Sequence, residues 1–68
     1  MEKKTFIVEG MSCNHCKQAV EKAVGALAGV RSAEVDLAAK QLTVEFDASV
    51  LGIAQIKSAV EEQGYDVA

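Results

Sequence analysis

Apolar and polar residues along the first half of this chain follow a strand period and then a helix period. The β-prone run Thr5–Val8 ends at Gly10. Residues 15–27 then carry apolar side chains at helical spacing, and Gly29 follows as a stop signal. The apolar stripe of this helix consists of Cys16, Ala19 or Val20, Ala23, Val24 and Leu27. The pattern predicts a strand followed by a helix.

The middle of the chain alternates with the period of two that is typical of half-buried strands. From Val30 to Leu37, the apolar positions are Ala33, Val35 and Leu37. In a third strand, Leu42, Val44 and Phe46 alternate with polar residues. The connection Ala38-Ala39-Lys40 is short but lacks the usual Asn-Gly turn chemistry.

A second helix and a short last strand complete the pattern. Gly52 is a candidate cap for a helix, and Gly64 is placed to end it in a left-handed turn before the strand Tyr65–Val67. The expected buried stripe consists of Ile53, Ile56, Ala59 and Val60.

The resulting order, βαββαβ, predicts an α+β fold of the ferredoxin-like type. Right-handed crossovers place both helices on one face of a four-stranded antiparallel sheet. A weak internal repeat supports this, because Thr5–Glu9 parallels Gln41–Glu45 and Ala19–Glu21 parallels Ala59–Glu61. Only the first strand-to-helix connection contains Cys, His or Met, so we expect the chemistry to lie there.

Length and composition restrict the alternatives. Sixty-eight residues, half of them hydrophobic, indicate a single domain over residues 1–68. A net charge of −3 argues against nucleic acid as a partner. Met1–Lys4 resembles the start of a signal peptide, but no apolar run follows, and no segment approaches membrane-spanning length. A reducing cytosol fits a site that needs reduced thiols.

Both cysteines lie in the stretch Gly10–Cys16, of sequence GMSCNHC. A structural zinc site takes four protein ligands, whereas this chain has two Cys and one His. Soft thiolates select Cu(I), which accepts low coordination. With Cys13 before the helix and Cys16 in its first turn, unpaired N–H groups and the helix dipole favour the thiolate form. The spacing therefore predicts a Cu(I) site.

Four neighbouring residues are candidates for supporting this loop. Met11 is expected to pack beneath it, with ligation as the alternative. Ser12 is expected to supply hydrogen bonds and solvation. His15 is a third ligand, a residue that tunes the thiolate charge, or a solvated loop residue. Tyr65 either lies beside the loop or packs at a sheet edge.

These residues, with Gly29-Val30 and Gly64-Tyr65 downstream, resemble the heavy-metal-associated domain family over essentially the whole chain. The chain is especially similar to small bacterial copper chaperones that deliver Cu(I) to P-type copper ATPases. The resemblance implies that Cys13 and Cys16 bind Cu(I), that Met11 supports the loop, and that the source is prokaryotic. It also implies an ATPase metal-binding domain as partner, with a copper-responsive repressor as a further partner. Lys17 departs from the apolar or small residue that often follows the second Cys.

Several functions compete with this one. A thiol–disulfide oxidoreductase also uses Cys-x-x-Cys at a helix start, but such folds usually need a cis-proline and this chain has no proline. A zinc or cadmium domain is expected to add a carboxylate at position 12, which is Ser12 here. Hg(II) also binds two thiolates, so a mercury-binding protein remains an alternative. The chain is either a free chaperone or an excised ATPase domain, and the lack of a linker at either end favours the free chaperone.

The surface around the loop is expected to guide docking. Lys17 and Lys22 lie on the helix that follows the cysteines, and Glu61 and Glu62 lie at the far end of the second helix. This arrangement predicts a mildly basic patch that meets an acidic partner. Two thiolates leave Cu(I) open, so we expect a monomer without metal and a homodimer bridged by Cu(I). No catalytic residue is predicted.

Overall fold

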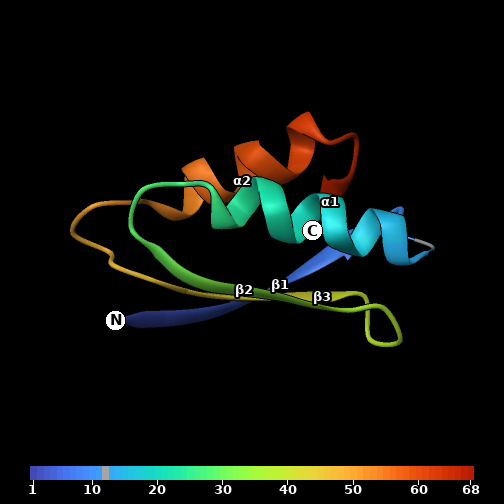
Figure 1. Cartoon of the computed structure of the whole chain (residues 1–68), viewed down its shortest axis with the longest axis horizontal. Coiled ribbons are helices and arrows are strands. Elements are labelled where there is room, and N and C mark those ends of the chain that lie inside the picture. The colour runs from blue at the N-terminus through green and yellow to red at the C-terminus, as the bar shows by residue number, and fades with distance from the viewer. Residues whose placement is uncertain (12) are drawn as a thin grey trace.

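The computed structural model describes residues 1–11 and 13–68. The elements are β1 (Glu2–Glu9), α1 (Asn14–Gly25), β2 (Val30–Asp36), β3 (Gln41–Phe46), α2 (Ile53–Glu62) and β4 (Asp66–Val67). The four strands form one antiparallel sheet in the order β2-β3-β1-β4, and both helices cover the same face of it (Figure 1). The predicted α+β, ferredoxin-like fold is confirmed. Within the described residues, no helix is long and apolar enough to cross a membrane.

The core lies between the helices and one face of the sheet. Alternate residues of β1 and β3 face it, as period-two patterning requires. The buried residues are Phe6, Val8, Met11, Val20, Val24, Val35, Leu42, Val44, Phe46, Leu51, Ile56, Ala59 and Val60. Full burial of one such aliphatic side chain stabilises the fold by about 1.5–3 kcal/mol. The buried residues of the two helices therefore hold the helices on the sheet. Glu21 adds a polar link, because its Oε2 accepts the Val35 N–H of the edge strand at 2.8 Å.

Some boundaries differ from the sequence-based expectation. β1 begins at Glu2 rather than Thr5, because Glu2 pairs with Phe46 across the sheet. α1 ends at Gly25, two residues before the predicted end, since Ala26 caps it and donates to the Lys22 carbonyl. Ile53 was expected in the buried stripe of α2, but it is the first residue of the helix and is 38% exposed.

In the turn between β2 and β3, the side-chain hydrogen bonds come from a residue that was predicted to lie in a strand. Asp36 Oδ1 accepts the backbone N–H groups of Ala38 and Ala39, at 3.0 and 3.3 Å. Lys40 has a φ of 55°, which places it in the left-handed region. An aspartate that bonds its own following backbone thus replaces the missing Asn-Gly pair.

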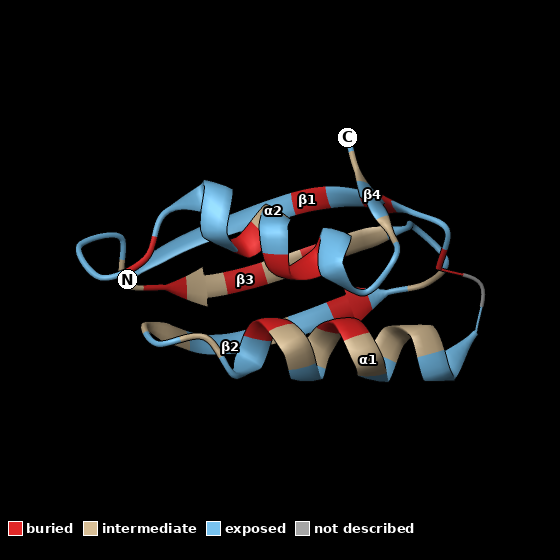
Figure 2. Ribbon diagram, turned by 90° about the horizontal axis from the view of Figure 1, so that it is seen from above, coloured by how far each residue is buried: buried red, intermediate tan, exposed pale blue. Residues whose placement is uncertain are grey.

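The two ends of the molecule consist of different segments. α1 lies over β2, and α2 lies over the other side of the sheet (Figure 2). The last residues of β1, the start of α1 and the β2–β3 turn meet at one end, which we call the site end (Figure 1). A hydrogen bond from Val8 N–H to the Lys40 carbonyl, at 2.9 Å, joins two of these segments. The N-terminus and the β3–α2 connection lie at the opposite end.

Candidate metal site

Two sulfur atoms lie together at the start of α1. Cys13 is the N-cap residue, with φ −153° and ψ 172°, and Cys16 is in the first turn, as predicted. Their Sγ atoms are 3.5 Å apart, and no disulfide joins them. Cys13 is exposed and Cys16 is half-buried. The pair is therefore open to a metal ion or to a partner's side chain from the Cys13 side.

The helix start favours negative charge on these sulfurs. The Cys13 carbonyl accepts the Lys17 N–H at 3.1 Å, but no side chain of the described residues caps the helix. The first turn of α1 also contains no Asp or Glu. Because the first backbone N–H groups of a helix have no partner within it, an anion at this position is stabilised. The two Sγ atoms lie at this position.

Met11 and Gly10 shape the loop from below. Met11 is only 6% exposed and belongs to the core cluster, in agreement with packing beneath the loop. Gly10 has a φ of +97°, and a Cβ there would lie 3.3 Å from Tyr65 Cδ1. The backbone therefore turns sharply out of β1 and lets the Tyr65 ring approach closely.

Tyr65 reaches the site from the other half of the chain. A hydrogen bond with Cys16, together with partial desolvation, raises the pKa of the Tyr65 hydroxyl above its usual value near 10. The neutral O–H is thereby favoured, as expected of a donor to sulfur. The ring is half-buried and packs against the core. Of the two placements considered for Tyr65, the structure has the one beside the cysteine loop.

Two further candidates, His15 and Ser12, belong to the same loop. His15 is exposed, and Ser12 lies outside the described residues. Within residues 1–11 and 13–68, no group of three or more His, Cys, Asp or Glu side chains is arranged to hold a metal ion. The described site therefore offers two sulfurs and a tyrosine hydroxyl.

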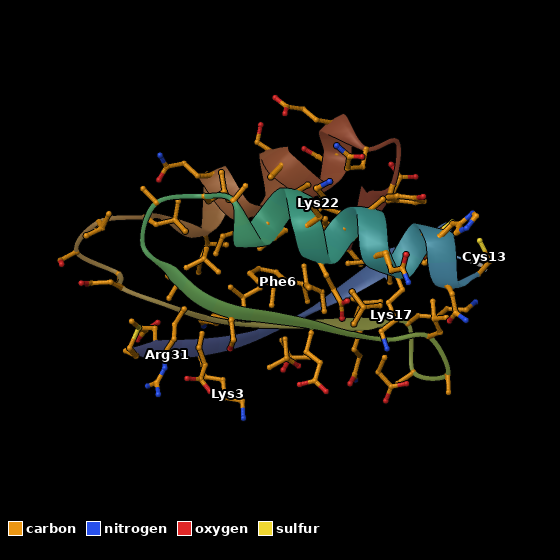
Figure 3. The ribbon with its side chains drawn as sticks, in the orientation of Figure 1. Lys3, Phe6, Cys13, Lys17, Lys22 and Arg31 are labelled. Carbon is orange, nitrogen blue, oxygen red and sulfur yellow. The ribbon has the colours of Figure 1, made fainter. Side chains whose placement is uncertain are left out.

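The charged residues proposed for docking lie on the two helices. Lys17 directly follows Cys16, but Lys22 lies in the last turn of α1, about 9 Å further along the helix axis than Cys16 (Figure 3). Glu61 and Glu62 end α2, which runs toward the site end and continues through Gly64 to Tyr65. The last turn of α2 lies about level with Lys22 along the long axis of the molecule, so Lys17 is the basic residue next to the cysteines (Figure 3).

Comparisons with known proteins agree with this geometry. The heavy-metal-associated domain matches residues 5–66. The copper chaperone CopZ of Bacillus subtilis (strain 168) is 53% identical over 68 residues, which cover 100% of this chain and 99% of that protein. A solved CopZ metallochaperone has a TM-score of 0.97 at 48% identity, covering 98% of this chain and 100% of that one. A copper binding domain from HMA7, a P-type ATPase, has a TM-score of 0.96 at 32% identity, covering 100% and 92%. The chain belongs to the heavy-metal-associated domain family.

Proposed function

We propose that this chain is a copper chaperone whose single domain, residues 1–68, binds one Cu(I) through the thiolates of Cys13 and Cys16. The observation that carries the proposal is the pair of sulfurs 3.5 Å apart at an uncapped and exposed helix start. The CopZ proteins that match over nearly their whole length are named as copper chaperones, which supports a carrier rather than an enzyme.

The sulfur pair suits a soft ion that accepts two ligands. Thiolates select Cu(I) over harder divalent ions. Thiolate bonds to a d10 ion such as zinc are about 2.3 Å long, so a straight arrangement of two sulfurs around such an ion spans about 4.6 Å. The present separation of 3.5 Å needs an opening of about 1 Å on this estimate. Rotation of the exposed Cys13 side chain is the motion that supplies it.

Delivery proceeds by exchange of thiolates. The exposed Cys13 side admits a third sulfur, from a Cys-x-x-Cys domain of a copper-transporting P-type ATPase. The ligands then change one at a time, so that the ion is never released free. The structural similarity to a copper binding domain from a P-type ATPase supports this partner. A copper-responsive repressor is a further recipient, and a reducing cytosol is the compartment that keeps both thiols reduced.

Neighbouring residues support the pair without binding the ion. Met11 holds the loop on the core, and the Tyr65 hydroxyl orients Cys16. His15 tunes the charge of the site, and Ser12 supplies hydrogen bonds to the loop. Groups of this kind typically change metal affinity by about 10–100-fold when they are removed. Lys17 contributes to docking because it is the basic residue next to Cys16.

An anaerobic titration with Cu(I) against a competing chelator tests the proposal. We expect one Cu(I) per chain, with protons released on binding because thiolates replace thiols. Replacement of either Cys by Ser is expected to abolish tight binding and to leave the metal-free fold intact, measured by circular dichroism. Full Cu(I) binding in Cys13→Ser/Cys16→Ser would overturn it. Parallel titrations with Hg(II) and Zn(II) decide between Cu(I) and the alternative of a mercury-binding protein.

Two thiolates leave the ion open to a second molecule of the chain. We propose a monomer without metal and a homodimer bridged by Cu(I) when the metal is in excess. Sedimentation velocity distinguishes the two states, and a stable metal-free dimer would contradict the bridged form.

A further inference from the structure

The first half of β1 forms an edge of the sheet, although β1 is a central strand in the order β2-β3-β1-β4. β4 pairs only with the last two residues of β1, and Ala68 adds one hydrogen bond from its N–H to the Ile7 carbonyl at 2.9 Å. Among the described residues, no strand pairs with the outer side of Glu2–Phe6 (Figure 2). This part of β1 is therefore open to an added strand.

The backbone groups on this edge belong to Lys3 and Thr5. In an antiparallel sheet, successive residues of a strand direct their N–H and C=O groups to opposite sides. Val8 donates to the Lys40 carbonyl on the β3 side, and the Ile7 carbonyl accepts on the β4 side. Counting in steps of two from Ile7 places the N–H and C=O groups of Thr5 and Lys3 on the outer side.

The opposite edge of the sheet, β2, is protected. Glu21 of α1 accepts the Val35 N–H at 2.8 Å, which occupies an outward donor of β2. A register shift between Val30 and Ser32 also interrupts this strand. Bulges and covered donors are features that prevent edge strands from pairing further. In contrast, β1 pairs with β3 over Glu2–Ile7 without a break, so its outer edge is regular.

The side chains along the open edge define what an added strand carries. Lys4 lies between Glu2 and Phe6 on the face of β1 that the helices cover. Its partner on β3 is the buried Val44, whereas Lys3 on the other face already lies opposite a glutamate of β3. Opposite charges and apolar pairs stabilise neighbouring strands. A complementary strand therefore places an acidic residue opposite Lys4, a basic one opposite Glu2 and an apolar one opposite Phe6.

The two lysines disfavour a second copy of the chain at this edge. An antiparallel pairing of the edge with itself, centred on Lys3, on Lys4 or between them, sets lysine against lysine. A pairing centred on Thr5 brings Glu2 against Val8, where β4 already lies. Charged side chains at an edge prevent self-association in this way. The edge thus suits a segment of another protein.

We propose that the outer edge of β1 binds an extended segment of a partner protein, which adds a strand antiparallel to Glu2–Phe6. Strand addition of this kind obtains affinity from backbone hydrogen bonds and specificity from alternate side chains. In chain order the segment carries an apolar residue, an acidic residue two places later and a basic residue two places after that. The inference goes beyond the proposed function, since no step of it involves Cu(I).

The edge lies away from the cysteines. Glu2 pairs with Phe46 at the end of the molecule opposite the site end, and Lys3 and Cys13 lie toward different ends in Figure 3. Met1, which is 73% exposed, precedes the edge and adds apolar surface that a bound segment can cover. A segment bound here leaves Cys13 exposed. The chain can therefore be held by one partner while its thiols stay open to a metal ion or to another partner.

Amide hydrogen exchange on the metal-free chain tests the added strand directly. The probe is the acetylated and amidated peptide Thr-Val-Thr-Glu-Thr-Lys-Thr, whose Val, Glu and Lys are placed opposite Phe6, Lys4 and Glu2. At saturating peptide we expect exchange at the N–H groups of Lys3 and Thr5 to slow by about tenfold or more, because each gains an acceptor. Protection at other positions instead, or no binding at about 1 mM peptide, overturns the proposal.

N-methylated peptides separate backbone pairing from other contacts. Methylation of the two threonines opposite Thr5 and Lys3 removes the donors that face β1, and is expected to weaken binding about tenfold or more. Methylation of the Val and Glu of the probe is the control, because their amides face away from β1. It is expected to change the affinity by about twofold or less. Equal effects of the two methylations refute strand addition.

Charge variants test the side-chain match. Lys4→Glu is expected to weaken binding of the probe about threefold, and a probe with Lys in place of Glu is expected to regain the loss. Lys22→Glu makes the same change of charge on α1 and is expected to bind the probe like the original chain; an equal loss in both variants refutes the match. Cu(I) stoichiometry is measured in parallel. Loss of Cu(I) binding refutes the proposed function alone, and failure of the peptide experiments refutes the edge alone.

Discussion

The two strand-to-helix connections of this molecule occupy equivalent places in the fold but differ in the side-chain hydrogen bonds at their helix starts. Between β1 and α1, Cys13 caps the helix with no side-chain hydrogen bond. Between β3 and α2, the Gln55 side chain folds back and its Oε1 accepts the Gly52 N–H at 2.7 Å. The Gly52 N–H thus has a side-chain acceptor, whereas among the described residues no side chain caps the start of α1.

The second connection contains further hydrogen bonds between its own residues. Asp47 Oδ1 accepts both the N–H and the hydroxyl of Ser49, and these bonds lower the pKa of Asp47. Each connection also anchors one apolar residue in the core, Met11 in the first and Leu51 in the second. The anchoring is therefore shared, and the described residues of the two connections differ in their polar groups. Neither N-cap side chain caps its helix, so the two starts differ in that α1 carries the sulfur pair and α2 carries the Gln55 bond to the Gly52 N–H.

The largest expected effect comes from moving the thiols to the second helix. Gly52→Cys/Gln55→Cys, in a chain with Cys13→Ser/Cys16→Ser, places sulfurs at the N-cap and third positions of α2 and removes the Gln55 cap. We expect Cu(I) binding to return, about 10–100-fold weaker than in the original chain because the Tyr65 contact is missing. Competition with a Cu(I) chelator measures it. Complete absence of binding in a folded variant would show that a helix start with two thiols is insufficient.

The anchors provide the next comparison. Met11→Ala and Leu51→Ala each remove a buried side chain, and each is expected to lower the free energy of unfolding by about 2–5 kcal/mol. Of the two changes, Met11→Ala is the one expected to weaken Cu(I) binding, because Met11 belongs to the thiol loop and Leu51 does not. Urea unfolding and chelator competition measure the two quantities on the same samples. Equal effects of both changes on Cu(I) affinity would mean that general stability controls the site.

The two connections are also expected to respond to opposite limits of pH. Tyr65 has a raised pKa, so its contribution to stability is complete below about pH 10 and is lost as pH rises through the folded value. Asp47 has a lowered pKa, so its contribution is present above its unfolded value and is lost as pH falls through the folded one. Stability profiles of Tyr65→Phe and Asp47→Asn check this. Each variant should be flatter than the original chain at its own limit and unchanged at the other.

The smallest expected effect concerns His15. In its proposed role His15 tunes the charge of the site from an exposed position. His15→Ala is therefore expected to change Cu(I) affinity by about threefold or less, since exposed charges interact weakly. A loss of many-fold, or a nitrogen at bonding distance in X-ray absorption, would make His15 a ligand.

Much of this architecture could be predicted from the sequence, because the periodic apolar positions of each element are the ones that pack into the core. The alternation in Leu42, Val44 and Phe46 predicted buried faces, and all three are buried. The position of Cys13 and Cys16 at a helix start followed from the apolar stripe that begins at Cys16. Patterns of this kind are local, so no contact needs to be known in advance.

The remaining features depend on contacts between distant segments. The start of β1 at Glu2 follows from pairing with Phe46. The meeting of Tyr65 with Gly10 and Cys16 is set by how β4 joins β1. The role of Asp36 in the turn needs the side-chain conformation that bonds Ala38 and Ala39. Periodicity contains none of this information.

The central claim is that the open helix start passes Cu(I) directly to another thiol pair. The most direct measurement is the rate of Cu(I) transfer from this chain to an isolated copper-binding domain of a P-type ATPase, at increasing concentrations of that domain. Direct exchange predicts a rate that rises in proportion to the domain concentration and that is lost when its Cys-x-x-Cys is replaced by Ser-x-x-Ser. A rate that is independent of the domain concentration, and equal to release into a chelator, would contradict the account.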